Sequence, residues 1–365
     1  MRILFIGDYS NLHATLAKEL KARGHDVSVL SDRCGYIGSH ADIFLKRDRG
    51  IAGGFKYLYN LFNLLPHLKG YDIVQFINPN FLNLRPGKIK YFFDRIKDQN
   101  GKMFLTMAGN DYFFCKACLE GKIFRFSEFK IGNEFTDFHK SNPNHLYGWT
   151  SYANRHWNEY FYDQIDGAMS ILPEYDMVAK EVIPDKTIFT NLPIDLDQLI
   201  QNNKQIENPI KIFIGIRSGM EVQKGAKLLL NIAKELEKEN SERLQVEMVT
   251  DIPLNEFIKR MSLSDIVLDQ LYAYSPATTA LMAMGMGKVT GTGAQPEYYE
   301  YIGNPDFKPI FSLSPFDKNI RERLLNLIDN PAEIKRLGEE SRKIVKAHND
   351  VKIVTDKFLK HWNKR

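Results

Sequence analysis

The chain has 365 residues, too many for one ordinary small domain, and this length predicts two domains of middling size. Its 44% hydrophobic and 26% charged residues are typical of a soluble globular protein with enough apolar material for two cores. A net charge of +4 is too small to indicate nucleic-acid binding, and no apolar run approaches the roughly 20 residues that span a bilayer.

The chain opens on a pattern of strand, turn, helix and strand. Residues 3–6 are apolar like a buried strand, and residues 7–11 follow as a turn. Residues 12–23 carry leucines at helical spacing and stop at Gly24, and residues 27–30 form the next strand. Such a βαβ unit requires a parallel sheet with a right-handed crossover. We find no secretory signal in this start and expect a cytoplasmic protein, with docking on the inner face of the membrane left open.

Parallel sheets bind ligands at the carboxyl ends of their strands. Asp8, Tyr9 and Ser10 follow the first strand, and Asn78 follows a strand predicted at residues 72–77. A strand at residues 102–107 leads to Asn110 and Asp111, and a further strand is predicted at residues 167–172. We expect these polar residues to line a ligand-binding wall, although a helix or turn cap is an alternative role for Asp111.

Residues 112–160 are aromatic-rich, with little periodicity, and we predict an irregular insertion with short helices. Membrane contact and internal packing are both open for four of its residues, namely Phe124, Arg125, Phe126 and Lys130. The polar stretch at residues 201–205 is the best domain boundary. We therefore predict a first domain at residues 1–195, a second at 205–345, and a C-terminal segment at 346–365 with the option of returning to the first domain.

The second half restarts the alternation of strands and helices. Strands are predicted at residues 210–215, 244–249, 265–268 and 288–290, and helices at 226–238, 255–261, 278–286 and 350–362. The simplest assembly is an α/β protein with two Rossmann-like domains that face each other across a cleft.

A charged loop follows the strand at residues 210–215. It carries Arg217 and Lys224, lies between Gly215 and Gly225, and leads directly into a helix. Arginine supplies a planar fork of donors and lysine a compact charge, so the two together can neutralise a diphosphate. A solvated surface loop is the plain alternative for this segment.

A second polar turn, after residues 265–268, leads into a helix of small residues. Ser275 is predicted as its N-cap and Pro276 as its first residue, and Thr278 and Thr279 add hydroxyl donors. Free backbone amides and the helix dipole favour an anion at such an end. A capped core helix is the alternative, because alanine and methionine usually indicate packing.

These two segments resemble the donor-binding domain of family four retaining glycosyltransferases (glycosyltransferase group 1), which have the GT-B fold. In that family a strand ends in Gly-x-Arg and a Lys-Gly pair begins a helix, matched here by Gly215, Arg217, Lys224 and Gly225. Residues 264–270, 283–289 and 191–197 resemble further family segments. The resemblance covers most of the chain and is most specific at residues 188–300.

The resemblance implies that Arg217 and Lys224 hold the donor diphosphate and stabilise the departing nucleotide, so no metal or other cofactor is expected. Asp111 is the third candidate catalytic residue. The implied acceptor side consists of Asp8, Tyr9, Ser10, Asn78 and Asn110. The implied donor-binding residues are Gly215, Gly225, Thr250, Asp251, Ile252, Tyr274, Ser275, Thr278, Thr279 and Met282, with residues 250–253 facing the base.

Two departures from the family leave donor recognition and activity open. Members usually carry two glutamates separated by seven residues, at positions where this chain has Tyr274 and Met282. A thioether cannot replace a charged hydrogen-bond acceptor. The family's His-Gly-x-Asp segment begins here with Ala108 in place of the histidine.

The resemblance implies transfer of a hexosyl or similar group from a nucleoside diphosphate sugar to a saccharide or lipid-linked acceptor, with retention. No carboxylate pair indicates glycoside hydrolysis. Two alternatives stay open: a degenerate, non-catalytic nucleotide-sugar-binding protein of this fold, and a nucleotide-sugar epimerase of related fold.

The cysteines and histidines give no sign of a metal site. Cys34, Cys115 and Cys118 are an odd number, which favours reduced thiols, and the lone CxxC lacks a second ligand pair for zinc. We interpret His13 and His25 as structural.

Overall fold

The computed structural model describes residues 1–32, 41–201 and 205–365. Cys34 and residues 202–204 of the predicted boundary therefore lie outside the described residues. The chain folds into two compact units. The first comprises Met1–Ala117, Asn144–Pro193 and Val354–Arg365, and the second comprises Cys118–Pro143 and Ile194–Ile353. These units are less contiguous than the expected domains, because Cys118–Pro143 groups with the second unit and Val354–Arg365 with the first.

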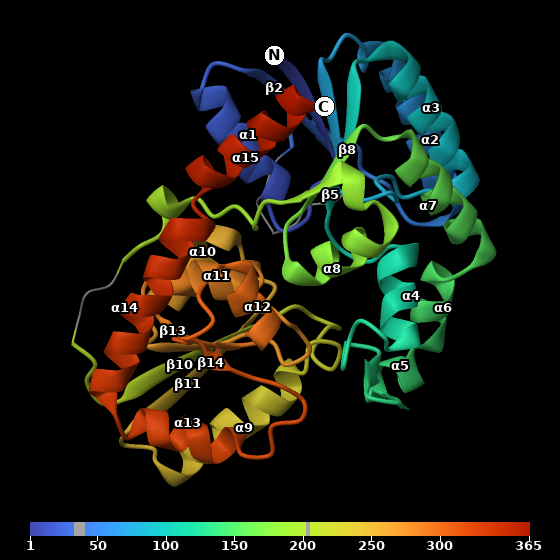
Figure 1. Ribbon diagram of the computed structural model, residues 1–365. Coiled ribbons are helices and arrows are strands. Elements are labelled where there is room, and N and C mark those ends of the chain that lie inside the picture. The colour runs from blue at the N-terminus through green and yellow to red at the C-terminus, as the bar shows by residue number, and fades with distance from the viewer. Residues whose placement is uncertain (33–40, 202–204) are drawn as a thin grey trace. The chain divides into compact units, whose positions relative to one another are not determined.

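The first unit is built on a seven-stranded sheet with the order β3-β2-β1-β4-β5-β8-β9 (Figure 1). Every pairing in it is parallel. Its strands are β1 (Arg2–Ile6), β2 (Asp26–Ser31), β3 (Ile43–Phe44), β4 (Ile73–Phe76), β5 (Lys102–Met107), β8 (Gly167–Ser170) and β9 (Thr187–Phe189). Its helices are α1 (Leu12–Ala22), α2 (Gly50–Leu64), α3 (Pro86–Gln99), α4 (Tyr112–Glu120, which crosses into the second unit), α6 (Pro143–Trp149), α7 (Tyr152–Gln164), α8 (Pro173–Val182) and α15 (Val351–Lys364).

Both faces of this sheet are covered, which explains the continuous apolar sequence of β1. Successive side chains of a strand point to opposite faces. Leu4 and Ile6 pack in the core beneath α2, α3 and α7. On the other face Phe5 contacts Trp362 of α15, with ring centroids 6.2 Å apart.

The strand order of the first sheet reverses between β1 and β4. Ligands of doubly wound sheets bind at such a switch point, outside the carboxyl ends of the two strands. The loops after β1 and β4, which hold Asp8 and Asn78, are therefore the places where this unit can offer a site.

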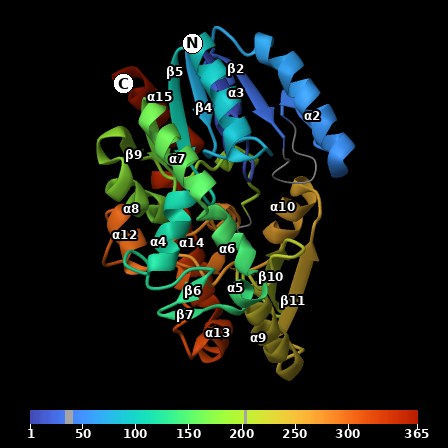
Figure 2. The same ribbon diagram turned by 90° about the vertical axis from the view of Figure 1, so that its right-hand side faces the viewer.

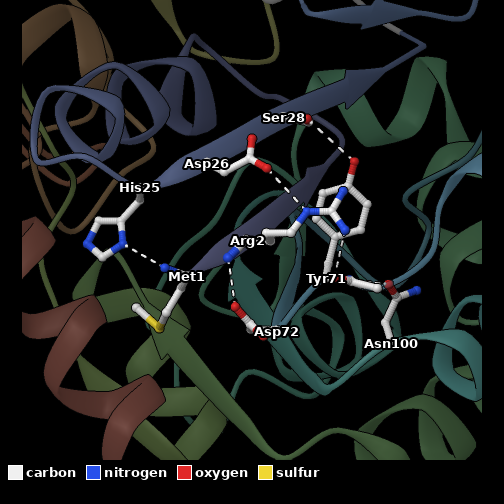
Figure 3. Close-up of polar contacts among 9 residues, drawn as sticks. Met1, Arg2, His25, Asp26, Ser28, Tyr71, Asp72 and Asn100 are labelled. Carbon is white, nitrogen blue, oxygen red and sulfur yellow. Dashed lines mark hydrogen bonds and ion pairs between the residues drawn. The ribbon is translucent and has the colours of Figure 1, made fainter.

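The opposite, amino-terminal edge of the first sheet is closed by a polar network (Figure 3). The Arg2 backbone N–H donates to Asp72 over 2.7 Å, and its guanidinium pairs with Asp26 over 3.2 Å. The same guanidinium lies 4.8 Å from the centre of the Tyr71 ring. The Tyr71 backbone N–H in turn donates to Asn100 over 2.9 Å, so the network ties β1, β2 and α3 together.

The second unit contains a five-stranded parallel sheet with the order β11-β10-β12-β13-β14. Helices α9 and α13 pack on one face, and on the other Phe257 of α10 contacts Phe213 of β10. The strands are β10 (Ile210–Ile216), β11 (Leu244–Thr250), β12 (Ile266–Leu268), β13 (Val289–Thr292) and β14 (Phe311–Ser312). The helices are α9 (Ala226–Glu239), α10 (Leu254–Ser262), α11 (Thr278–Gly285), α12 (Pro296–Tyr301), α13 (Ile320–Ile328) and α14 (Pro331–His348).

The predicted irregular insertion is only partly irregular. Its middle holds a small hairpin, β6 (Lys130–Ile131) with β7 (Glu134–Phe135), and the short helix α5 (Asp137–Ser141). The short helices expected in it are present as α4, α5 and α6, and its last part forms the longer regular helix α7. Trp157 and Phe161, at helical spacing, are buried against Phe93 of α3, so its aromatic residues form a packing face.

Candidate functional site

The loop that carries Arg217 and Lys224 lies at the switch point of the second sheet. The strand order reverses between β10 and β12, and Arg217 is the first residue after β10. The loop ends at Gly225, the N-cap of α9, which has a φ of 71°. A side chain on Gly225 would lie 2.7 Å from Leu271 and 3.3 Å from the Tyr272 ring. Glycine thus lets this loop approach the turn after β12, where the Leu271 N–H donates to the Lys224 carbonyl over 2.9 Å.

The electrostatics of this switch point involve a residue outside the predicted set, Asp269. It follows β12 directly and is buried, and its Oδ2 has no hydrogen-bond partner within the described part of the chain. Burial raises the pKa of Asp269, and the positive charge of Lys224 opposes that rise. The position right after a predicted strand was the signal that could have identified it. Arg217, by contrast, is exposed at the carboxyl edge.

The loop expected to face the base is hydrogen-bonded to the Arg217 loop. Thr250 ends β11, and Asp251 has a φ of 49°, a left-handed conformation that is rare for a residue other than glycine. The Asp251 carboxylate accepts a hydrogen bond from the Ser218 N–H over 3.2 Å. Hydrogen bonds from Ser218 hold the pKa of Asp251 below its usual range. Ile252 follows, half-buried.

Gly215 has a packing role inside β10. A side chain on it would lie 2.4 Å from the Phe257 ring, so the glycine allows α10 to pack closely on the sheet. A donor-binding role for Gly215 stays a prediction.

Tyr274 links the turn after β12 to the Cys118–Pro143 segment. Its buried hydroxyl accepts hydrogen bonds from the backbone N–H groups of Arg125, over 2.5 Å, and Phe126, over 3.3 Å. Its ring stacks on Phe126, with centroids 4.6 Å apart and planes at 18°. The Arg125 guanidinium also pairs with Glu297 over 2.9 Å. Of the residues considered for membrane contact, Phe124 and Phe126 are therefore packed inside the second unit.

The predicted cap of α11 was wrong. The helix begins at Thr278, and its N-cap is Ala277, whose side chain makes no capping bond. Ser275 lies two residues before Ala277 and is fully buried. It does not cap the helix, because the chain is still extended at Ala277, with φ −95° and ψ −170°. Thr278 and Thr279 lie in the first turn of the helix, half-buried. Met282 is buried one turn later.

A cavity of about 550 Å³ lies in the second unit between the hairpin segment and Tyr272, in the turn after β12. Tyr272, which packs against Gly225, forms part of its wall. The opposite wall belongs to the hairpin and α5, and its polar side chains are those of Asn133, Glu134, Thr136, Asp137 and Lys140. No sequence pattern indicated this cavity, because its two walls are far apart in the chain.

At the switch point of the first sheet, the loop after β1 is strained and holds a buried carboxylate. Ser10 and Asn11 have φ values of 53° and 61°. Asp8 accepts a hydrogen bond from the His13 N–H over 3.0 Å. Burial raises the pKa of Asp8 to about 6, although backbone N–H groups at the start of α1 oppose the rise. Non-glycine residues in this backbone region and shifted carboxyl groups both gather at functional sites.

The other predicted residues of this edge brace neighbouring loops. The Asn78 amide donates to the carbonyls of Ala108, over 2.8 Å, and Asn110, over 3.1 Å. The Tyr9 ring lies against Gly109, where an added side chain would come within 3.1 Å of it. The first sheet thus brings together the loops after β1, β4 and β5. Ser10 is exposed at this edge.

Asp111 caps α4. Its buried carboxylate accepts hydrogen bonds from the Phe114 N–H over 2.8 Å and from the Tyr162 hydroxyl over 2.5 Å. Burial raises the pKa of Asp111. The capping alternative is the role that the structure gives this residue, and a catalytic role stays a prediction.

Within the described residues, His13, His25, Cys115 and Cys118 belong to no cluster that could hold a metal ion. His13 is buried, with Nδ1 2.7 Å from the Gly7 carbonyl and Nε2 2.9 Å from the Thr106 hydroxyl, and burial lowers its pKa to about 3. His25 lies 3.4 Å from the Met1 amine. Cys115 and Cys118 are both buried. Across residues 1–32, 41–201 and 205–365 there is no cluster suited to a metal ion, and no helix is both long and apolar enough to span a bilayer.

Solved structures of similar fold are GT-B glycosyltransferases. Sucrose-phosphate synthase from Thermosynechococcus elongatus has a TM-score of 0.63 at 12% identity, over 100% of this chain and 99% of that one. Anabaena HepE, solved with UDP and glucose, has a TM-score of 0.63 at 13% identity over 100% of both chains. WaaG, a glycosyltransferase involved in lipopolysaccharide biosynthesis, has a TM-score of 0.58 at 14% identity over 98% of both chains. No protein-family model and no curated protein matches the sequence. The likeness confirms the α/β GT-B fold.

Proposed function

We propose that this chain is a glycosyltransferase that moves a hexosyl or similar group from a nucleoside diphosphate sugar to a saccharide or lipid-linked acceptor, with retention. The observation that carries the proposal is the loop with Arg217 and Lys224 at the reversal of strand order between β10 and β12. A sheet offers its ligand site at this point, and the two cations suit a diphosphate. The GT-B fold supports the assignment.

The proposed chemistry needs little beyond positioning and charge. The bond between the anomeric carbon and the diphosphate oxygen breaks, and its electron pair leaves with the nucleotide. The acceptor oxygen bonds to that carbon and gives up its proton to the departing phosphate or to water. Arg217, Lys224 and the amides at the start of α11 stabilise the negative charge that develops on the leaving group. The buried carboxylate of Asp269 is proposed to orient the Lys224 ammonium.

The remaining parts of the donor have candidate places in the same unit. The loop of Thr250, Asp251 and Ile252 is proposed to face the base. The cavity beside Tyr272 has a volume and a polar lining that suit a sugar ring. We also propose a peripheral membrane contact, because a lipid-linked acceptor is presented at a bilayer surface.

The experiment combines donor binding with turnover. UDP, GDP and ADP are tested for a shift in melting temperature, and the corresponding nucleotide sugars for slow release of free nucleotide. Arg217→Ala and Lys224→Ala are each expected to abolish the shift and to lower kcat/KM by about 100-fold or more, as expected when a charge-stabilising donor is lost. Lys238→Ala is the matched control, since it removes an exposed cation at the other end of α9.

Two outcomes would contradict the proposal. If no nucleotide shifts the melting temperature, or if the Arg217 and Lys224 variants respond like Lys238→Ala, the diphosphate site is wrong. If a nucleotide binds but neither donor hydrolysis nor transfer is detected with any sugar, the non-catalytic alternative replaces the transferase.

A further inference from the structure

Helix α2 exposes an apolar stripe that the proposed reaction does not use. Ile51, Phe55, Tyr59 and Phe62 recur at helical spacing and are 81%, 70%, 66% and 50% exposed. The other side of α2 is also apolar, with Tyr57 and Leu61 buried in the core of the first unit. A surface helix of a globular protein normally has a polar outer face, and a contiguous exposed apolar patch marks an interaction site.

The stripe continues onto α3. The Phe62 ring lies 5.8 Å from Tyr91 and 5.2 Å from Phe92, measured between centroids. Tyr91 is exposed, and the Arg95 guanidinium lies 5.6 Å from its ring centre. Figure 2 shows α2 on the outside of the first unit. The apolar surface therefore extends over two neighbouring helices.

Basic side chains surround this apolar surface. Residues 44–70 contain five lysines and arginines against one aspartate, and residues 85–99 contain five against two. Lys46, Arg49, Lys56 and Lys88 are exposed among them. Asp48, the acidic residue beside α2, lies 3.3 Å from the Lys46 ammonium and 3.6 Å from that of Lys56. The surface therefore combines an apolar centre with a positive rim, the arrangement by which helices bind anionic bilayers.

A groove deepens the surface at the C-terminal end of α2. It has a volume of about 720 Å³, and its apolar walls come from Phe62, Leu65 and Pro66. Lys69 and Arg2 supply cations at its sides, and the Arg2 guanidinium is already paired with Asp26. The groove thus places the Lys69 ammonium next to apolar side chains. This arrangement suits a lipid, whose anionic headgroup would pair with the lysine while its acyl chains contact the apolar walls.

We propose that the exposed faces of α2 and α3 dock the protein on an anionic membrane surface. Helix α2 starts at the carboxyl edge of the first sheet, because it crosses back from β3 to the parallel strand β4. Near that start, the Arg47 guanidinium donates to the Asn83 side chain over 3.1 Å, in the loop region that follows β4. One end of the docking face therefore lies at the edge that holds Asp8 and Ser10. This docking proposal rests on the membrane contact proposed above, and it does not depend on the transfer reaction.

The test is flotation of the full chain with phosphatidylcholine vesicles with and without phosphatidylglycerol. The protein is expected to float with the anionic vesicles at low salt and to be released at 1 M salt, where the Debye length falls to about 3 Å. Phe55→Ser is expected to weaken the partition by about tenfold, which is the loss of one buried aromatic side chain. Lys56→Gln is expected to weaken it about fivefold, and only on anionic vesicles.

The matched control compares two exposed tyrosines on helices of the first unit. Tyr59→Ser should weaken flotation, whereas Tyr152→Ser on α7, 76% exposed, should leave it unchanged. Both side chains are exposed, so neither change should lower the melting temperature. Equal effects of the two changes, or no flotation of the unchanged protein, would overturn the docking face. A second result would also overturn it: the unchanged protein sediments as a dimer, Tyr59→Ser dissociates that dimer, and neither protein binds vesicles. Nucleotide-induced melting shifts report separately on the donor site.

Discussion

At the scale of single residues, the buried carboxyl of Asp8 predicts a pH dependence of stability. Burial raises its folded-state pKa to about 6, above the value near 4 of an unfolded chain. The folded state therefore binds more protons than the unfolded state between pH 4 and 6, and this group lowers the unfolding free energy as pH rises through that window. The effect amounts to about 3 kcal/mol.

Asp8→Asn should remove this dependence while its side-chain oxygen still accepts from the His13 N–H. Urea unfolding at pH 4, 5, 6 and 7 measures the unfolding free energy of both proteins. From the lowest to the highest pH, the unfolding free energy of the variant should rise by about 3 kcal/mol relative to that of the unchanged protein. Asp98→Asn, which removes an exposed carboxylate, should give a curve parallel to that of the unchanged protein. A parallel curve for Asp8→Asn as well would contradict the assignment.

The sequence predicted single residues well where their position relative to a strand is what matters. Asp8, Asn78, Arg217 and Thr250 lie at carboxyl ends of parallel strands, as the alternating pattern requires. It failed for Ser275, because the local pattern does not show how far the chain stays extended before a helix. The hydrogen-bond partners of Tyr274 could not be predicted, since the backbone amides that bind the Tyr274 hydroxyl are 148 and 149 positions away in the chain.

At the scale of elements, Tyr274 predicts how the Cys118–Pro143 segment is held. Tyr274→Phe keeps the ring stacked on Phe126 but leaves two backbone N–H groups without their acceptor, at about 1–3 kcal/mol each if both stay buried. The variant should melt lower and be cleaved faster by protease within this segment.

Tyr298→Phe is the control for the Tyr274 experiment. Tyr298 is also a buried tyrosine of the second unit, but its hydroxyl has no hydrogen-bond partner among the described residues. Its removal should leave the melting temperature unchanged or raise it slightly. If both variants are cleaved at the same rate, the Tyr274 hydroxyl does not hold the segment.

The strands and helices that the sequence analysis named were predicted nearly to the residue, and β5 has the predicted bounds, but the amphipathic helices α2, α3, α13 and α14 were not predicted. Helix α7 is longer and more regular than the short helices predicted for residues 112–160, because aromatic residues of its buried face did not show a clear helical period in the sequence. The small hairpin could not be predicted, since two-residue strands carry too little pattern.

At the scale of the whole molecule, most of the last helix, α15, belongs to the first unit. Loss of its contacts should therefore destabilise the first unit and not the second. The Trp362 indole N–H donates to Gln75 over 2.9 Å, and its ring packs against Phe5 and Phe104. Trp362→Ala should destabilise the first unit by about 3–5 kcal/mol.

Hydrogen exchange followed by mass spectrometry can locate this effect. Exchange should rise in β1, β4 and β5 and stay unchanged in β10 and β12, because units with separate cores open separately. Trp149→Ala, at a half-buried site on α6, should change neither sheet appreciably. A uniform rise across both sheets would contradict the division into units.

The return of Val354–Arg365 to the first unit also affects the order in which a growing chain can fold. A ribosome finishes most of the first sheet early, and domains usually fold as they emerge. Here the segment that covers Phe5 is synthesised only after every residue of the second unit. The unit that is translated first should therefore complete its fold second, with one face of its sheet uncovered and dependent on chaperones until Val354–Arg365 has been synthesised.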